Sequence, residues 1–371
     1  MTRNEELKIK RARLREYLLK HGLDAVLLSS QANFAWYGCG ADNHVVMCSE
    51  GGVAAILADG EKDCVITTNI EAGRIAEEEV GELKDFEVVG LPWNENRRMA
   101  DEIKERTKGK KVASDVAAFG LEMLPEDFQQ LTWQMTPAEI SRYRSLGKEC
   151  SRIIEHACMA AKRGETEHQL AARLASGAMA RGIIPHLVLV AADERIRNYR
   201  HPVPTDRKIR RQAMAVLCGK KHGLICSLTR LFWFGKSLPQ DLARRHAAVV
   251  EVDATFNAGT RPGRNVGEIF REAMNVYAVH GFADEWKLHH QGGACGYQGR
   301  SYKVTPDSRE IVLEHQAFAW NPSITGTKCE DTVLATEKGV EFLSAPTSKW
   351  PTVKVTVGGR TFRRPDILCL D

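Results

Sequence analysis

The chain has 371 residues, and its net charge of +4 is the small difference between 52 basic and 48 acidic side chains spread along its length. Because neither a basic stripe nor an acidic tail is present, the composition argues against nucleic acid as a partner and favours a small molecule or a protein. A chain of this length exceeds what one hydrophobic core usually organises, so two domains are expected.

The cysteines and the first residues bear on the cellular compartment. Ten cysteines lie at irregular spacing without a Cys-x-x-Cys pair, which is typical of reduced thiols in a cytosolic protein rather than of disulfides or a zinc knuckle. The N-terminus is charged, and no apolar run approaches the roughly 18 residues that a membrane span requires. We therefore expect a cytoplasmic protein that does not associate with membranes.

The first part of the chain alternates helical and strand patterns. Apolar residues at helical spacing from Asn4 to His21, followed by Gly22, predict an opening helix. Short β-rich runs and helical stretches then alternate up to Gln134. The strands are expected to begin near Ala25, Gly52, Asp63 and Lys111, and the helices to cover residues 71–80 and 97–108. This alternation predicts a small α/β domain over residues 1–135.

A second domain is expected to cover residues 136–371. Thr136 has the features of a helix cap, with Pro137 in the first turn and Glu139 three residues after the cap. Pairs of helices, each followed by strands, predict an α+β domain with a curved antiparallel sheet and helices on its outer face. The expected helices are 137–162, 166–181, 241–258 and 266–279, and the expected strands are 213–217, 223–234, 316–322, 330–336 and a terminal hairpin at 351–362.

Five strings in this second region follow one another in the order found in the creatinase and aminopeptidase P family. Arg163-Gly-Glu-Thr-Glu167 resembles the family's helix-joining Pro-Gly-x-Thr-Glu, and His201-Pro-Val-Pro-Thr205 resembles its substrate-site His-x-x-Pro-Thr. Its Asp-x-Thr-Arg, Glu-Pro and Glu-Asp-Thr strings are similar to Ser227-Leu-Thr-Arg230, Trp320-Asn-Pro322 and Cys329-Glu-Asp-Thr332. The resemblance implies a pita-bread C-terminal domain and a smaller, creatinase-type α/β N-terminal domain.

The resemblance also assigns a position to each ligand of the family's two-metal site, which needs two aspartates, one histidine and two glutamates. In this chain the aspartate positions hold Val216 and Ser227, the histidine position holds Gly293, and the first glutamate position holds Asn321. Glu330 is the one ligand retained. Because a single carboxylate does not hold two metal ions, we expect neither metal ligands nor a cofactor.

What remains is similar to creatinase, a member of the family that hydrolyses a guanidino C–N bond without metal. The resemblance implies that His201 is the general acid/base and that Glu330 stabilises the reacting group. Creatinase has a second glutamate where this chain has Thr229, so creatine is not the expected substrate. The alternatives are a surface-loop histidine at position 201 and a structural ion pair between Glu330 and Arg230.

Other polar residues near these positions are expected to line a substrate pocket. Arg300 suits a substrate carboxylate, because a guanidinium makes bidentate contacts with that group. Cys218 and Cys295 can face the same pocket, whereas Cys226 and Cys329 are expected to point away from it, since side chains alternate along a strand. The remaining expected substrate-binding residues are Arg200, Ser227, Thr229, His289, His290 and Asn321.

These residues favour a metal-independent hydrolase that cleaves an amide, amidine or guanidino C–N bond in a small polar, carboxylate-bearing substrate. A second interpretation is an inactive pita-bread protein that binds a peptide or protein, and a third is an Xaa-Pro metallopeptidase with altered ligands. The resemblance further implies a homodimer in which the N-terminal domain of one subunit closes the pocket of the other. Trp36, Tyr37 and Trp93 are aromatic candidates for that closure or for the core of the N-terminal domain.

Overall fold

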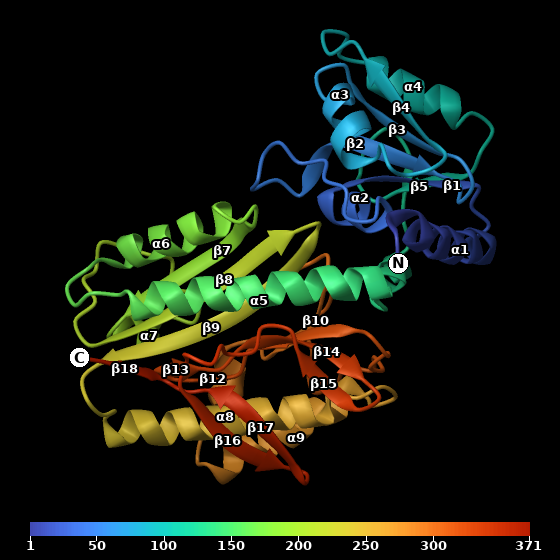
Figure 1. The fold of residues 1–371 in the computed structure, drawn as a ribbon. Coiled ribbons are helices and arrows are strands. Elements are labelled where there is room, and N and C mark those ends of the chain that lie inside the picture. Colours follow the sequence, from blue (N-terminus) through green and yellow to red (C-terminus); the bar gives the residue numbers. More distant parts are fainter. The chain divides into compact units, whose positions relative to one another are not determined.

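The computed structural model describes residues 1–371, which form two compact units. The N-terminal domain comprises residues 1–140 with 222–224, and the C-terminal domain comprises residues 141–221 and 225–371. Figure 1 shows the elements of both.

The N-terminal domain is built on one mixed sheet of six strands (Figure 1). Its strands are β1 Ala25–Ser30, β2 Gly51–Ala58, β3 Asp63–Thr68, β4 Phe86–Leu91, β5 Val112–Ser114 and β6 Glu122–Met123. The order in the sheet is β4-β3-β2-β1-β5-β6, with β1, β2 and β3 antiparallel and the outer pairs parallel. Its helices are α1 Arg3–His21, α2 Gln31–Tyr37, α3 Ala72–Arg74 and α4 Arg98–Arg106, with a π-helical turn at Ile75–Glu79 and a 3₁₀ helix at Glu126–Thr132.

The ends of α1 explain why the opening helix was predictable. The Thr2 side chain accepts a hydrogen bond from the Glu5 backbone N–H, and the Glu5 side chain accepts one from the Thr2 N–H, which is a complete capping box. At the other end Gly22 adopts a left-handed conformation with φ of 60°, which glycine tolerates at little cost. The prediction of this helix is confirmed.

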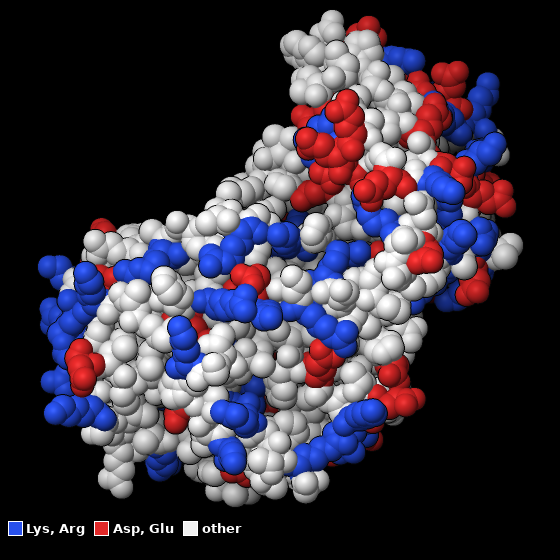
Figure 2. Space-filling view, in the orientation of Figure 1, with Lys and Arg blue, Asp and Glu red and all other residues white.

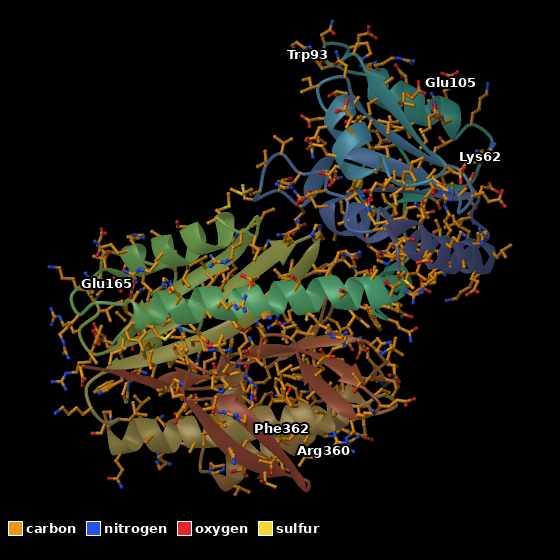
Figure 3. The ribbon with its side chains drawn as sticks, in the orientation of Figure 1. Lys62, Trp93, Glu105, Glu165, Arg360 and Phe362 are labelled. Atoms are coloured by element: carbon orange, nitrogen blue, oxygen red, sulfur yellow. The ribbon has the colours of Figure 1, made fainter.

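The aromatic candidates of the N-terminal domain differ in exposure. Trp36 and Tyr37, on the unpredicted helix α2, are fully buried. Trp93 has 62% of its surface exposed, and Figure 3 shows it at the surface of this domain. The short α2 has no polar face to reveal a helical period, which is why the sequence pattern missed it. Trp36 and Tyr37 therefore serve the domain core.

The C-terminal domain contains two four-stranded sheets and two small hairpins. Its helices are α5 Pro137–Met159, of which residues 141–159 belong to this unit, α6 Glu167–Met179, α7 Arg195–Asn198, α8 Gln240–Gly259 and α9 Val266–Val279, with a 3₁₀ helix, η3, at Glu285–Leu288. Its strands are β7 Ile184–Ala192, β8 Gln212–Lys221, β9 Leu224–Phe234, β10 Gly292–Cys295, β11 Ala317–Trp320, β12 Ser323–Ile324, β13 Thr327–Lys328, β14 Asp331–Thr336, β15 Gly339–Phe342, β16 Thr352–Val357, β17 Arg360–Pro365 and β18 Leu368–Leu370. The expected mixed α and β composition is confirmed.

Hydrogen bonding divides the single curved sheet that the sequence predicted into two. One has the order β18-β9-β8-β7 and the other β10-β11-β14-β15, and Figure 1 shows α5 and α6 beside the first and α8 and α9 beside the second. The sheets meet where Thr229 donates its N–H to the Glu330 carbonyl, at 3.1 Å. One residue pair along, the Thr332 hydroxyl donates to the Ser227 carbonyl at 2.9 Å. Thr229 and Glu330 therefore lie at the junction of the two sheets.

Local sequence signals fix several ends of these elements. Thr136 and Glu139 exchange the two hydrogen bonds of a capping box at the start of α5, as predicted. Within α5, a Cβ atom at Gly147 would lie 2.2 Å from the Leu343 carbonyl oxygen, so this close approach requires glycine. The expected terminal hairpin is β16–β17, which turns at Gly358-Gly359 with positive φ at both residues.

A network of buried charges holds the C-terminal domain together. The Arg230 guanidinium pairs with Glu155 at 3.2 Å and with Asp331 at 3.1 Å. Arg364 pairs with Asp331 at 2.9 Å and with Asp253 at 2.5 Å. All five side chains are at most 1% exposed, so each charge depends on its partners for the stabilisation that water would otherwise provide. The network links α5, β9, β14, α8 and β17.

The exterior carries charges of both signs. Figure 2 shows basic side chains spread over one face of the C-terminal domain, with acidic side chains among them. Some form exposed pairs, as Arg144 does with Glu341 at 2.6 Å. No helix of the chain has both the length and the apolar composition needed to cross a bilayer.

We expect the buried network to contribute much more to stability than the exposed pairs do. Arg230→Ala leaves Glu155 and Asp331 with one partner fewer, and breaking a buried pair in this way costs about 3–5 kcal/mol. The matched change Arg144→Ala breaks an exposed pair and costs about 1 kcal/mol or less. Denaturant unfolding of both variants measures the difference, and equal small losses would contradict the role given to the network.

Candidate functional site

The residues singled out by the sequence come from separate parts of the C-terminal domain. His201 lies in the segment between α7 and β8, and His289 and His290 lie between η3 and β10. Glu330 directly precedes β14, and Arg300 lies in the loop that follows β10. The fold brings these segments together near the junction of the two sheets, since Glu330 forms the bridge with Thr229.

Four of the five positions at which the resemblance places metal ligands lack the carboxylate or imidazole that the family's site needs. Val216 packs in an apolar cluster that includes Met214 and Leu231. The Ser227 hydroxyl donates to the Cys218 sulfur at 3.1 Å, and Asn321 offers only a neutral amide. At Gly293 a Cβ atom would lie 2.1 Å from the Tyr302 carbonyl oxygen, which leaves no room for a histidine side chain. The donor set therefore does not fit a dinuclear metal centre.

Glu330, the retained carboxylate, is held by cations of the chain itself. Its Oε2 accepts hydrogen bonds from the Thr229 hydroxyl and the Lys328 ammonium group, both at 2.7 Å. Its Oε1 accepts one from Arg300 at 3.1 Å. Burial raises the pKa of Glu330, but Lys328 and Arg300 outweigh burial and lower the pKa to about 2. The carboxylate is therefore ionised at neutral pH and forms ion pairs with two cations.

Arg230, the alternative partner for Glu330, faces the opposite side of the sheet. It pairs with Glu155 and Asp331, whereas Glu330 pairs with Lys328 and Arg300. The alternative prediction of a structural ion pair between Glu330 and Arg230 is therefore wrong. The separation follows from strand geometry, because successive side chains point to opposite faces.

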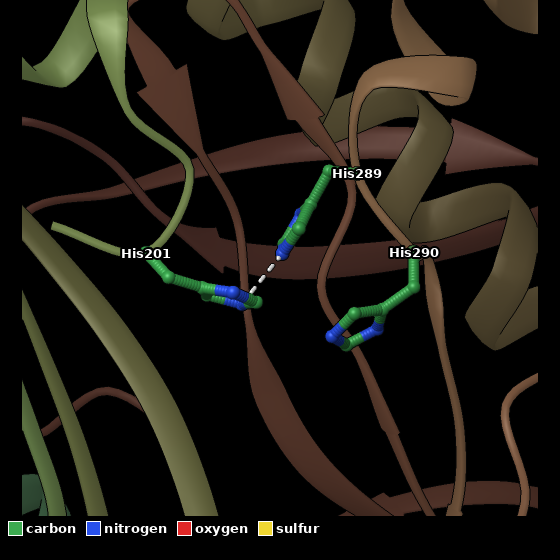
Figure 4. A group of neighbouring side chains, drawn as sticks. All are labelled: His201, His289 and His290. Atoms are coloured by element: carbon green, nitrogen blue, oxygen red, sulfur yellow. Dashed lines mark hydrogen bonds between the residues drawn. The ribbon is translucent and has the colours of Figure 1, made fainter.

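His201, His289 and His290 form a compact cluster (Figure 4). The Nε2 atoms of His201 and His289 lie 3.1 Å apart, and the His289 Nδ1 lies 3.3 Å from the Ser323 hydroxyl. One nitrogen of each of the three rings lies within 4.8 Å of those of the others. His289 is buried, His290 is half-buried and His201 is exposed.

All three imidazoles are neutral at physiological pH. Burial, followed by the positive charge of Lys328, lowers the pKa of His201 below its usual value and lowers that of His289 to about 2. Burial, followed by Arg300, lowers the pKa of His290 to about 4. Each ring therefore keeps one unprotonated nitrogen that can take a proton or bind a metal ion.

Three buried polar atoms at these positions have no partner within the chain. They are Asn321 Oδ1, Arg300 Nε and His290 Nδ1. A buried polar atom without a hydrogen bond is costly, so such atoms are suited to a polar ligand or ordered water. The cavity between His289 and Lys328 has a volume of only about 10 Å³, which is room for about one water molecule.

The cysteines follow the alternation that the sequence predicted. Cys226 interacts with Cys150, and Cys329 accepts a hydrogen bond from Arg364, so both point away from Glu330. Cys218 lies beside Ser227, and burial raises its pKa to about 11. Burial likewise raises the pKa of Cys295 to about 11. These thiols are protonated at neutral pH and are poor nucleophiles.

Sequence reasoning missed Lys328 and Ser323, and it placed Arg200 among the substrate-binding residues. The Arg200 guanidinium contacts Glu285 at 2.6 Å and the Thr325 hydroxyl at 2.9 Å, so it already has two partners. A signal for Lys328 was available, because residues two apart in a strand share a face and Lys328 precedes Glu330 by two positions. No comparable signal points to Ser323.

Two family models match the chain, in the order of its domains. The Creatinase/Prolidase N-terminal domain matches residues 10–145, and Metallopeptidase family M24 matches residues 141–337. The second match covers more than half of the chain, and the chain belongs to metallopeptidase family M24. This confirms the resemblance to the creatinase and aminopeptidase P family and the expected pita-bread fold.

Individual relatives are distant. An uncharacterized peptidase of Staphylococcus aureus strain MRSA252 is 24% identical over 152 residues, which are 39% of this chain and 43% of that protein. The chain thus aligns with less than half the length of this curated relative.

Solved structures share the whole fold. The Xaa-Pro dipeptidase of Bacillus anthracis superposes with a TM-score of 0.77 at 17% identity, over 98% of this chain and 100% of that one. The prolidase of Pyrococcus horikoshii OT3 gives 0.76 at 18%, over 92% and 99%. The N-terminal domain of the FACT complex subunit SPT16 from Cicer arietinum gives 0.70 at 12%, over 94% and 97%. At these identities the likeness shows the fold.

The lowered pKa of Glu330 leads to a prediction of how the stability of the fold depends on pH. Its pKa is about 2 when folded, against an ordinary value of 4.5, so its contribution is complete above pH 4.5 and is lost as the pH falls through 2. The difference in unfolding free energy between the native chain and Glu330→Gln should therefore shrink as the pH falls from 4.5 towards 2. Urea unfolding over this range measures it, with Glu341→Gln as the exposed control. A difference that does not change with pH would contradict the pairing.

Proposed function

We propose that the chain hydrolyses a C–N bond of a small, polar, carboxylate-bearing molecule without the two-metal centre of its family. Membership of family M24 supports a hydrolase of C–N bonds. The observation that carries the proposal is the hydrogen-bonded line of His201, His289 and Ser323. This line includes a neutral base, His201, near Lys328 and Arg300, the two cations that pair with Glu330.

The hydrogen bonds indicate how His201 works as the base. When the His289 Nδ1–H donates to the Ser323 hydroxyl, the His289 Nε2 accepts from the Nε2–H of His201. The Nδ1 of His201 then keeps a lone pair and takes a proton from water as the water oxygen bonds to the substrate carbon. As the C–N bond breaks, His201 returns that proton to the leaving nitrogen, so the ring ends neutral.

Lys328 and Arg300 provide positive charge for this reaction. Negative charge develops on the tetrahedral centre, and a fixed cation in a water-poor site stabilises it. Glu330 acts as a stabiliser by holding both cations in place, at 2.7 Å and 3.1 Å. The unpartnered Nε of Arg300 and Oδ1 of Asn321 supply further polar contacts for a substrate carboxylate or amide.

One observation favours a second function, a non-catalytic binding protein. Both oxygens of Glu330 already have partners within the chain. The SPT16 domain, a part of the FACT complex, has a related fold. In this alternative the pocket residues stabilise the domain and a peptide or protein binds elsewhere.

The expected homodimer and a cytoplasmic location remain predictions from the sequence. In the dimer, the exposed Trp93 is the aromatic residue available for closing a partner's pocket.

The hydrolase proposal predicts an activity that depends on His201 in a chelator-treated protein. Screening amides, amidines, guanidino acids and Xaa-Pro dipeptides identifies the substrate, and His201→Ala then lowers kcat/KM by about 10²–10⁴-fold. Because the unprotonated ring is the active form and its pKa lies below 6.5, kcat/KM should rise with pH through a value below 6.5. The exposed His168→Ala is the matched control. An active His201→Ala enzyme would contradict the mechanism, and no turnover of any class would favour the binding protein.

A further inference from the structure

We propose that His201, His289 and His290 form a binding site for a single transition-metal ion of the Zn²⁺ class. This site is separate from the family's metal positions, which do not fit a metal here. It uses the side chains of three histidines drawn from two segments of the chain, and Figure 4 shows the rings turned towards one another.

The geometry of the cluster suits one ion. Zn–N bonds are about 2.0–2.1 Å, which places neighbouring nitrogens of a tetrahedral site about 3.3 Å apart. The Nε2 atoms of His201 and His289 already lie 3.1 Å apart, and the nitrogen of His290 lies within 4.8 Å of both. His201 is exposed and His290 is half-buried, so the proposal requires these two rings to rotate to complete the set.

The hydrogen bond at the second nitrogen of His289 favours metal binding. An imidazole binds a metal through an unprotonated nitrogen. The Ser323 hydroxyl contacts the His289 Nδ1 at 3.3 Å, so this nitrogen carries the proton when it donates to Ser323 and the Nε2 is free to bind. A hydrogen-bond partner on the second ring nitrogen is typical of metal-binding histidines.

The donor set selects the kind of ion. Imidazole suits Zn²⁺, Co²⁺, Ni²⁺ and Cu²⁺, whereas Mg²⁺ and Ca²⁺ need oxygen ligands. Three protein ligands leave a fourth position for water or an anion. The charges around the rings, from Lys328, Arg300, Lys303 and Glu330, sum to a positive value. They weaken binding of the bare cation and favour an anionic fourth ligand such as hydroxide or a carboxylate.

The site has a consequence for catalysis, which rests on the proposed function. An ion bound to the Nε2 of His201 moves the proton of that ring to Nδ1, so the Nδ1 lone pair that accepts a proton in the mechanism is lost. Zn²⁺ should therefore inhibit the hydrolysis, and a chelator should restore it. Metal occupancy then regulates the same pocket that carries the reaction.

Calorimetric titration of the chelator-treated full chain with ZnCl₂ tests the site directly, without any need for activity. We expect one Zn²⁺ per chain and no binding of MgCl₂ at the same concentrations. His289→Ala and His290→Ala should each weaken Zn²⁺ binding by about tenfold or more, the loss that even an outer partner of a metal ligand causes. His168→Ala removes an exposed histidine on α6 and should bind Zn²⁺ as the native chain does. Circular dichroism checks the fold of each variant.

The outcomes separate this proposal from the proposed function. Absence of Zn²⁺ binding, or binding unchanged in both His289→Ala and His290→Ala, overturns the three-histidine site whatever the activity. Two ions per chain that are lost in Glu330→Gln also overturn it, because they indicate a centre at the family's metal positions. Binding of one ion with activity that requires the ion supports the site and overturns the metal-independent mechanism. Binding of one ion that inhibits activity supports both.

Discussion

Two adjacent buried carboxylates, which face opposite sides of one sheet, determine how the buried cations of the C-terminal domain are arranged. Glu330 forms ion pairs with Lys328 and Arg300 on the side that faces the histidines. Asp331 forms ion pairs with Arg230 and Arg364 on the other side. Neither charge is stable in the interior without its cations. The side facing Asp331 connects helices and strands into one core, and the side facing Glu330 determines the charge of the pocket.

This arrangement differs from the two-metal site that the family resemblance implies at the same positions. Where related proteins use carboxylates and a histidine to hold two metal ions, this chain has apolar, neutral or absent side chains at Val216, Ser227, Gly293 and Asn321. Positive charge comes instead from a lysine and an arginine that the chain itself supplies. The pocket is consequently cationic, its histidines are neutral, and its remaining unpartnered atoms suit a polar, negatively charged ligand.

Much of the fold was predictable because its signals are local. Capping residues at Thr136 and Thr166 and the glycines at 358–359 mark ends and turns without reference to distant residues. The missed strands include β4, β7 and β10. β4 and β7 lack a clear alternation of apolar and polar residues, and β10 has only four residues. The division of the expected sheet into two was also missed, because it depends on which edges pair across the junction at Thr229 and Glu330.

The sequence, through its resemblance to the family, predicted which ligands are lost and that His201 and Glu330 remain, and strand alternation determined that Cys226 and Cys329 point away from the pocket. Only the tertiary structure decided the partners of Glu330 and the contact between His201 and His289, which are separated by 88 positions. Such a contact depends on how the surrounding sheets and helices position the two loops that contain these histidines. Residue identity and spacing carry no information on that distance, whereas packing fixes it.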